Sequence, residues 1–92
     1  MGISCVYLII SGKVQGVGYR YYAKRKAENL GLTSWIRNTS NGHVESRVEG
    51  TKQAVQDFIN WAHQGPDNAV VSNIIQKTLA EQPAFENFEI HS

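Results

Sequence analysis

The chain has 92 residues, of which 41% are hydrophobic and 18% are charged, and its formal net charge is +1. This length fits a single domain over residues 1–92, and the near-neutral charge gives no general reason to expect a nucleic-acid or membrane partner. Cys5 is the only cysteine, so an intrachain disulfide and a Cys₄ or Cys₂His₂ zinc site are excluded. We expect Cys5 to be a small buried strand residue. No basic segment precedes an apolar stretch, so we expect no signal peptide and a cytoplasmic location.

The first third of the sequence predicts a strand, a loop and a helix. Residues 3–11 are apolar and rich in β-branched side chains, which is typical of a strand buried on both faces. Residues 12–19 contain three glycines and no apolar period, so they predict a loop. Residues 20–30 follow a helical period, and Gly31 stands where a C-terminal cap glycine belongs. The apolar positions of this helix are Ala23, Ala27 and Leu30.

The middle of the sequence predicts a β-hairpin. Residues 32–39 favour a strand, and the Asn-Gly pair at 41–42 is a strong turn signal. Residues 43–49 alternate between apolar and polar side chains, which indicates a half-buried strand.

The last part predicts a second helix and two further strands. Thr51 is the expected N-cap of the helix, and the Gly-Pro pair at 65–66 ends it. Residues 69–79 favour a long strand, residues 80–84 a turn, and residues 85–91 a short final strand. The apolar stripe of the helix consists of Val55, Phe58, Ile59 and Ala62.

The order of these elements is β-α-β-β-α-β with a further short strand. This order is typical of an α+β, ferredoxin-like sandwich, in which two helices cover one face of an antiparallel sheet. Many unrelated functions use this fold, so the fold alone does not identify the function.

The glycine-rich loop leads from an apolar strand into the first turn of a helix, and Arg20 falls in that turn. Glycines let the backbone approach a ligand closely, and the helix N-terminus adds unpaired N–H groups and partial positive charge. Together these features form an anion site, where a planar guanidinium can bind two phosphate oxygens. An exposed arginine there without an anion costs roughly 0.3–1 kcal/mol. The residues alone leave two possibilities, an anion site or a simple turn followed by a solvated arginine.

Other catalytic patterns are absent from the sequence. It contains no Gly-x-x-x-x-Gly-Lys-Ser/Thr motif, and the Gly-Val-Gly run at 16–18 lacks the third glycine of a dinucleotide fingerprint. It also shows no obvious Ser-His-Asp or Cys-His constellation and no acidic or histidine cluster with metal-ligand spacing. We therefore expect neither a metal ion nor a cofactor.

Two separated motifs resemble those of a known family. The segment GKVQGVGYR at 12–20 resembles the acylphosphatase signature Gly-x-Val-Gln-Gly-Val-x-aromatic-Arg. The segment WIRNTSNGHV at 35–44 is similar to the second signature, in which an aromatic residue and an asparagine precede Gly-x-Val. Gly50 and the Gly-Pro pair at 65–66 match further landmarks, so the resemblance covers essentially the whole chain. It implies a free-standing, bacterial-type, metal-independent acylphosphatase. Such an enzyme hydrolyses small acyl phosphates to a carboxylate and inorganic phosphate.

The resemblance also implies roles for individual residues. Arg20 would bind the phosphate, and Asn38 would orient the nucleophilic water. Gly12, Gln15 and Thr39 match positions that support the site. Backbone N–H groups of the loop would cradle the phosphate oxygens, and these phosphate-binding residues are Gln15, Gly16, Val17, Gly18, Tyr19 and Arg20.

The sequence departs from the family pattern close to Asn38. Ser34 stands where a glycine is usual, and Ile36 stands where a smaller residue is common. Gly18 occupies the variable position of the first signature. Without the resemblance, Asn38 is typical of a residue leading into a turn, so its catalytic role rests on the family.

Two alternatives belong to other functional classes. Many RNA-binding domains share this element order, and residues 20–26 combine basic and aromatic side chains. However, the strand over 43–49, which would carry stacking aromatics, has none. The second alternative is a domain that binds acyl or carbamoyl phosphate inside a larger protein. We favour a monomeric enzyme with small acyl phosphates as substrates and no nucleic-acid or membrane partner.

Overall fold

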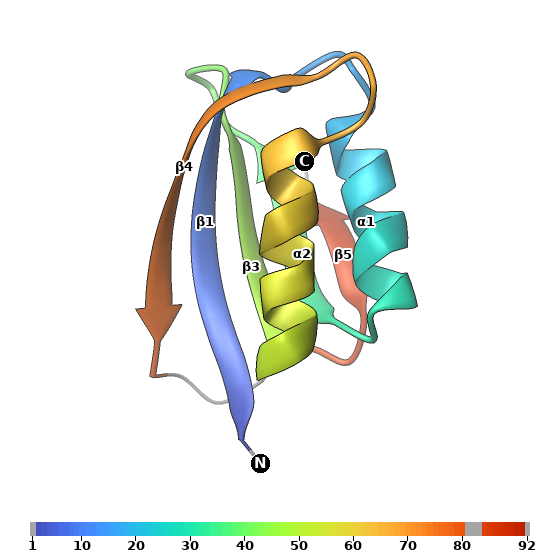
Figure 1. The fold of residues 1–92 in the computed structure, drawn as a ribbon, viewed down its shortest axis with the longest axis vertical. Coiled ribbons are helices and arrows are strands. Elements are labelled where there is room, and N and C mark those ends of the chain that lie inside the picture. Colours follow the sequence, from blue (N-terminus) through green and yellow to red (C-terminus); the bar gives the residue numbers. More distant parts are fainter. Residues whose placement is uncertain (1, 81–83, 92) are drawn as a thin grey trace.

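A computed structural model describes residues 2–80 and 84–91 of the chain. All the described strands form one five-stranded sheet in the order β4-β1-β3-β2-β5, and both helices pack against the same face of it (Figure 1). This arrangement confirms the predicted ferredoxin-like α+β fold. The elements are β1 (Ile3–Lys13), α1 (Tyr19–Asn29), β2 (Thr33–Asn38), β3 (Val44–Thr51), α2 (Lys52–Gln64), β4 (Val70–Leu79) and β5 (Phe88–His91).

The sheet is mixed and not antiparallel throughout. The pairs β1–β4, β1–β3 and β2–β3 are antiparallel, as predicted, but β5 runs parallel to β2, with Arg37 opposite His91. β4 and β5 lie at opposite edges of the sheet and run in opposite directions. Because β4 is antiparallel to β1, and β1 and β2 run in the same direction, β5 is parallel to β2. The short final strand was predicted, but not its parallel partner.

β1 is longer than the sequence predicts, and it is less deeply buried. It continues through Gly12 to Lys13, where its pairing with β4 shifts register between Ser11 and Gly12. Its helix-facing side chains are buried, whereas Tyr7 and Ile9 on the other face are only half-buried, because no helix covers that face. The turn predicted over 80–84 falls partly on residues 81–83, which lie outside the described part of the chain.

The helix ends follow the local signals in the sequence. Gly31 has a φ of 74°, and the N–H groups of Gly31 and Leu32 donate to the carbonyls of Glu28 and Ala27, at 3.1 and 2.8 Å. This pattern is a Schellman motif, which requires the left-handed conformation that glycine adopts without strain. The Thr51 hydroxyl accepts a hydrogen bond from the Ala54 N–H at 3.1 Å, as expected of an N-cap.

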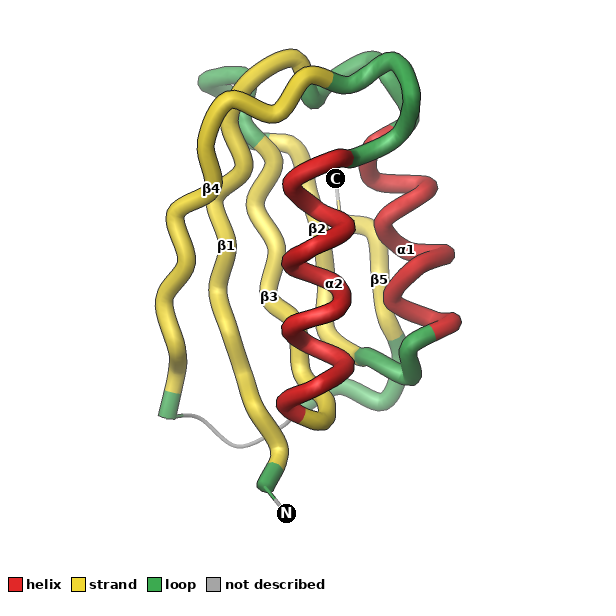
Figure 2. The backbone as a smooth tube through the Cα atoms, viewed as in Figure 1, coloured by secondary structure: helices red, strands yellow, loops and turns green. Residues whose placement is uncertain are grey.

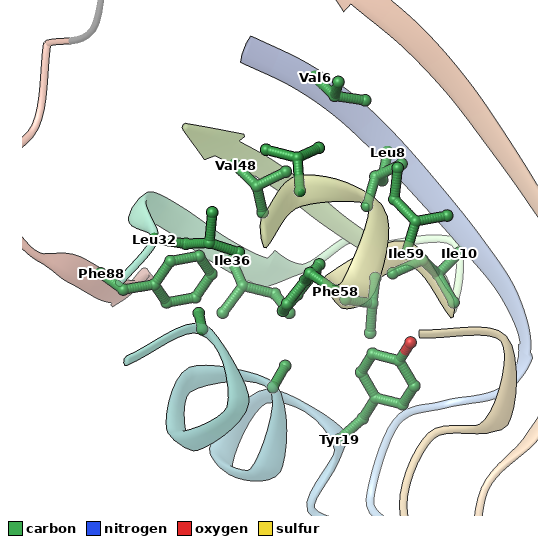
Figure 3. Packing of buried hydrophobic residues seen from close by; sticks show 14 of the residues in the cluster. Val6, Leu8, Ile10, Tyr19, Leu32, Ile36, Val48, Phe58, Ile59 and Phe88 are labelled. Carbon is green, nitrogen blue, oxygen red and sulfur yellow. The ribbon is translucent and has the colours of Figure 1, made fainter. Parts of the chain in front are cut away.

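The hydrophobic core lies between the sheet and the two helices. Figure 3 shows side chains from β1, β2, β5 and both helices converging there, including Leu8, Ile36, Phe58 and Phe88. The predicted stripe of α2 is buried throughout, and Cys5 is buried as predicted. No described helix has the length and apolar character needed to cross a membrane.

The loops relevant to function gather at one end of the sheet. β1 and β2 both run antiparallel to β3, so both finish at this end, and β5 finishes there because it is parallel to β2. Figure 2 shows the β1–α1 loop, the β2–β3 turn and the α2–β4 loop together at this end. The fold therefore brings both sequence motifs to one place.

Candidate active site

The loop before α1 presents an uncapped helix N-terminus. Gly16 and Gly18 have φ values of 74° and 77°, and Gly18 is the N-cap residue without a side-chain cap. The first helical hydrogen bond runs from the Tyr22 N–H to the Gly18 carbonyl, at 3.1 Å. The N–H groups just before Tyr22 therefore lack helical acceptors, and no acidic residue lies in the first turn. The backbone here suits an anion.

Arg20 is the second residue of α1, so it lies in the first helical turn, where the sequence predicts it. Its side chain is half-buried and forms no ion pair or hydrogen bond with any other described residue. A guanidinium held beside the positive end of a helix dipole is electrostatically unfavourable unless an anion binds there.

Arg20 and Asn38 line the same hollow, whose volume is about 220 Å³. Of the predicted phosphate-binding residues, Gly16, Gly18 and Tyr19 also line this hollow, whereas Gln15 and Val17 do not. Sequence reasoning missed three other lining residues, Val14, Tyr21 and Ile90. Val14 and Tyr21 flank predicted positions and could have been included on that basis. No signal pointed to Ile90, because its place depends on the parallel pairing of β5.

Asn38 is the last residue of β2 and pairs with Val44 across the hairpin. Its Oδ1 atom is buried and has no hydrogen-bond partner among the described residues. A buried acceptor without a partner costs about 1–3 kcal/mol of folding free energy. Asn38 is therefore kept in place by the surrounding strand and turn, at some cost to stability.

Gln15 joins the glycine-rich loop to the β2–β3 turn. Its side-chain amide donates hydrogen bonds to the carbonyls of Thr39 and His43, at 2.8 and 2.9 Å. Within the turn, the Thr39 N–H donates to the His43 carbonyl at 2.9 Å, and the His43 N–H donates to Thr39 Oγ1 at 3.1 Å. These bonds couple the segment carrying Arg20 to the segment carrying Asn38.

Gly12 and Tyr19, two further predicted site residues, pack closely against neighbouring segments. A β-carbon on Gly12 would lie only 2.1 Å from the Val70 carbonyl oxygen, so this position of β1 requires glycine. The Tyr19 ring is buried in the core and its hydroxyl donates to the Ala62 carbonyl at 2.7 Å (Figure 3). Burial raises the pKa of Tyr19. The Tyr19 side chain is therefore not free to reach an anion, and only its backbone remains for that role.

The two residues that depart from the family pattern have different local roles. Ile36 is fully buried in the core and faces the helices. Ser34 is also fully buried, with a φ of 115°, a conformation that favours glycine. The Ser34 N–H donates to the Asn87 carbonyl at 3.0 Å, so the strained backbone is held by its neighbours.

Comparisons with known proteins agree with this fold and with both motifs. The family model for acylphosphatases matches residues 6–90. The acylphosphatase of Acaryochloris marina is 48% identical over 86 residues, which cover 91% of this chain and 92% of the relative. The structure of an acylphosphatase from Coxiella burnetii has a TM-score of 0.92 and 34% identity, and covers 97% of this chain and 93% of that one. That of Bacillus subtilis acylphosphatase has a TM-score of 0.94 and 29% identity, with coverage of 97% and 99%.

The chain therefore belongs to the acylphosphatase family. Members of this family are enzymes that hydrolyse the carboxyl–phosphate bond of acyl phosphates, and the predicted enzymatic function is confirmed at this level. The alternative of a nucleic-acid-binding module is not favoured.

Proposed function

We propose that Arg20 and Asn38 form the catalytic pair of this acylphosphatase, with water attacking phosphorus in line with the departing carboxylate. The supporting observation is that a half-buried Arg20, without an anionic partner among the described residues, shares one hollow with Asn38 at an uncapped helix N-terminus. Backbone N–H groups of residues 15–20 cradle the phosphate oxygens, and Gly12, Gln15 and Thr39 support this geometry.

Few catalytic groups are needed for this reaction. The leaving group is a carboxylate whose conjugate acid has a pKa of about 4, so it departs without a general acid. Phosphoryl transfer depends mainly on positioning and on stabilising charge at the equatorial oxygens. Arg20 and the loop amides supply that charge stabilisation. The described residues hold no group of three metal-ligating side chains, and we expect hydrolysis without a metal ion.

The role of Asn38 is to orient the attacking water. An amide oxygen accepts a hydrogen bond but is a poor base, so Asn38 aligns the water and does not remove its proton. Because Oδ1 is buried, the Asn38 amide must rotate before this atom can meet a water molecule. The proton then passes to the phosphate itself.

The test is to follow the loss of benzoyl phosphate in EDTA with the wild type and with Arg20→Gln. Glutamine keeps a donor but loses the charge and the bidentate fork, so we expect KM to rise roughly 10–100-fold. Circular dichroism and thermal unfolding verify that the variant is folded. Absence of wild-type hydrolysis above background in EDTA would refute the metal-independent mechanism, and an unchanged KM in folded Arg20→Gln would refute the phosphate-binding role.

We further propose that residues 1–92 act as one monomeric domain in the cytoplasm, without a cofactor and without a nucleic-acid or membrane partner. The near-neutral charge supports the absence of a nucleic-acid or membrane partner. Size-exclusion chromatography with light scattering tests the monomer. Binding to RNA that weakens steeply with added salt would contradict the absence of a nucleic-acid partner.

A further inference from the structure

A second concave surface borders the phosphate loop. It has a volume of about 490 Å³ and lies between the start of α1, the end of α2 and the loop that follows α2. Such a volume is within the range of small-molecule sites, about 300–1,000 Å³. We call it the side groove, and the lining residues that matter here are Val17, Tyr22, Trp61, Pro66 and Asp67.

The phosphate loop separates the side groove from the hollow that holds Arg20 and Asn38. Gly16 and Gly18 line the hollow, whereas Val17 between them lines the side groove. The Tyr22 ring lies against this loop, since a β-carbon on Gly18 would be 3.4 Å from Tyr22 Cε2. The two concavities share no lining residue, but adjacent residues of the same loop line both of them.

The other wall of the side groove is anchored to the same loop. Figure 2 shows the segment after α2 passing the N-terminal end of α1 on its way to β4. At Gly65, which has a φ of 65°, a β-carbon would lie 2.8 Å from the Tyr19 ring. The Tyr19 hydroxyl also binds the Ala62 carbonyl. Both walls therefore keep a fixed position relative to the phosphate site.

In-line attack sets the direction of the acyl group. The attacking water and the leaving oxygen lie on opposite sides of phosphorus. With the water held at Asn38, the acyl half of the substrate points away from Asn38, and the side groove borders the loop without including Asn38. We propose that the side groove binds the acyl half of the substrate. This inference rests on the proposed function and extends it to the choice of substrate.

The lining of the side groove indicates which acyl groups it accepts. The rings of Tyr22 and Trp61 offer aromatic surface to a flat group, whereas Gln64, Asp67 and Asn68 make much of the remaining lining polar. Asp67 is the charged residue among those that line the groove, and it forms no ion pair with other described residues. Its negative charge disfavours an acyl group that carries a carboxylate or a second phosphate. The side groove therefore favours uncharged acyl groups over anionic ones.

A matched pair of substrates tests the charge selection. Benzoyl phosphate and para-carboxybenzoyl phosphate share one shape and differ by one charge on the acyl half. Asp67→Asn should raise kcat/KM for the carboxylated substrate, relative to benzoyl phosphate, by roughly threefold to tenfold at low ionic strength and by less at high ionic strength. Asp57→Asn is the matched control, because it removes the same charge from α2 outside the side groove, and it should leave the ratio unchanged.

The outcomes separate this inference from the proposed function. If the wild type hydrolyses benzoyl phosphate but Asp67→Asn changes both substrates equally, or neither, the side groove does not select the acyl group and the proposed function stands. The same conclusion follows if Asp57→Asn shifts the ratio as much as Asp67→Asn does. If the wild type hydrolyses neither substrate, the proposed function itself fails, and the inference fails with it.

A binding measurement gives a readout that is independent of turnover. Benzoylphosphonate, a non-hydrolysable analogue, should shift the indole N–H resonance of Trp61, whereas inorganic phosphate alone should not. Trp35 lies on the sheet face away from the helices and serves as the internal control, so its indole resonance should stay in place. A benzoylphosphonate complex in which the Trp61 resonance does not move would overturn the assignment of the side groove.

Discussion

Asn38 combines a buried, unsatisfied acceptor with a position on the rim of the hollow. We predict that Asn38→Ala lowers kcat roughly 10–100-fold with little change in KM, because the water loses its alignment while the phosphate contacts remain. Steady-state kinetics with benzoyl phosphate measures both constants. Asn60→Ala, on the exposed face of α2, is the matched control. If kcat of folded Asn38→Ala equals that of the wild type, Asn38 does not position the water.

Ser34 tests backbone strain at a single residue. Ser34→Gly and Ser34→Ala both remove the hydroxyl, so the two variants differ only by a β-carbon at a φ of 115°. Glycine tolerates this conformation, and strain at such positions is of order 1–3 kcal/mol. We predict that Ser34→Gly is more stable than Ser34→Ala by about 1 kcal/mol, a reversal of the usual order of the two residues. Urea unfolding measures the difference, and an alanine variant as stable as the glycine one would show that the position is unstrained.

At the scale of elements, the candidate active site consists of a strand-to-helix loop and a hairpin turn that Gln15 connects. We predict that Gln15→Leu destabilises the protein by about 1–3 kcal/mol, because it removes two hydrogen bonds worth about 0.5–1.5 kcal/mol each, although both carbonyls keep a backbone donor. It should also lower kcat, since the loop and the turn are no longer held in register. Gln53→Leu removes an exposed hydrogen bond to Asp57 and should have a much smaller effect on stability. Equal losses in both variants, by chemical unfolding, would contradict a connecting role for Gln15.

Local signals in the sequence predicted most of these elements and how they end. The Gly31 cap, the Thr51 cap and the α2 stripe depend on residues near one another in the chain, so the sequence contains the required information. The parallel pairing of β5, and with it the place of Ile90, depends on which sheet edge is vacant after the other strands have paired. The strain at Ser34 and the buried Oδ1 of Asn38 likewise depend on tertiary packing, which no local pattern contains.

At the scale of the whole molecule, the sheet face without helices is crossed by a hydrogen-bonded group from three adjacent strands. Tyr7 and Arg37 both donate to the Glu45 carboxylate. Burial by itself would raise the pKa of Glu45, but the hydrogen bonds from Tyr7 and Arg37 and the Arg37 charge outweigh it and lower that pKa from its ordinary value of 4.5. Burial, together with the Glu45 carboxylate, raises the pKa of Tyr7 to about 12.

These shifts predict how stability depends on pH. Because the pKa of Glu45 is lowered on folding, its contribution is present above the ordinary value of 4.5 and is lost as pH falls through the folded pKa. The contribution of Tyr7 is present below pH 10.0 and is lost as pH rises toward about 12. Glu45→Gln should therefore destabilise the protein at neutral pH and converge with the wild type in acid. Urea unfolding from neutral to acidic pH measures the difference in unfolding free energy between the wild type and Glu45→Gln. A difference that does not narrow in acid would exclude a role for Glu45 ionisation.

The parallel pairing of β5 with β2 bears on how the protein should be produced for these experiments. Ile90 lines the hollow with Arg20 and Asn38, so a purification tag fused after His91 would begin near the proposed catalytic pair. At the other terminus, Ile3 pairs with Thr51, far along β3 from the β2–β3 turn, and Figure 1 shows the N-terminus at the opposite end of the sheet from that turn. An affinity handle placed before Ile3 keeps the hollow accessible, and kinetic constants from such a protein describe the enzyme without interference from the tag.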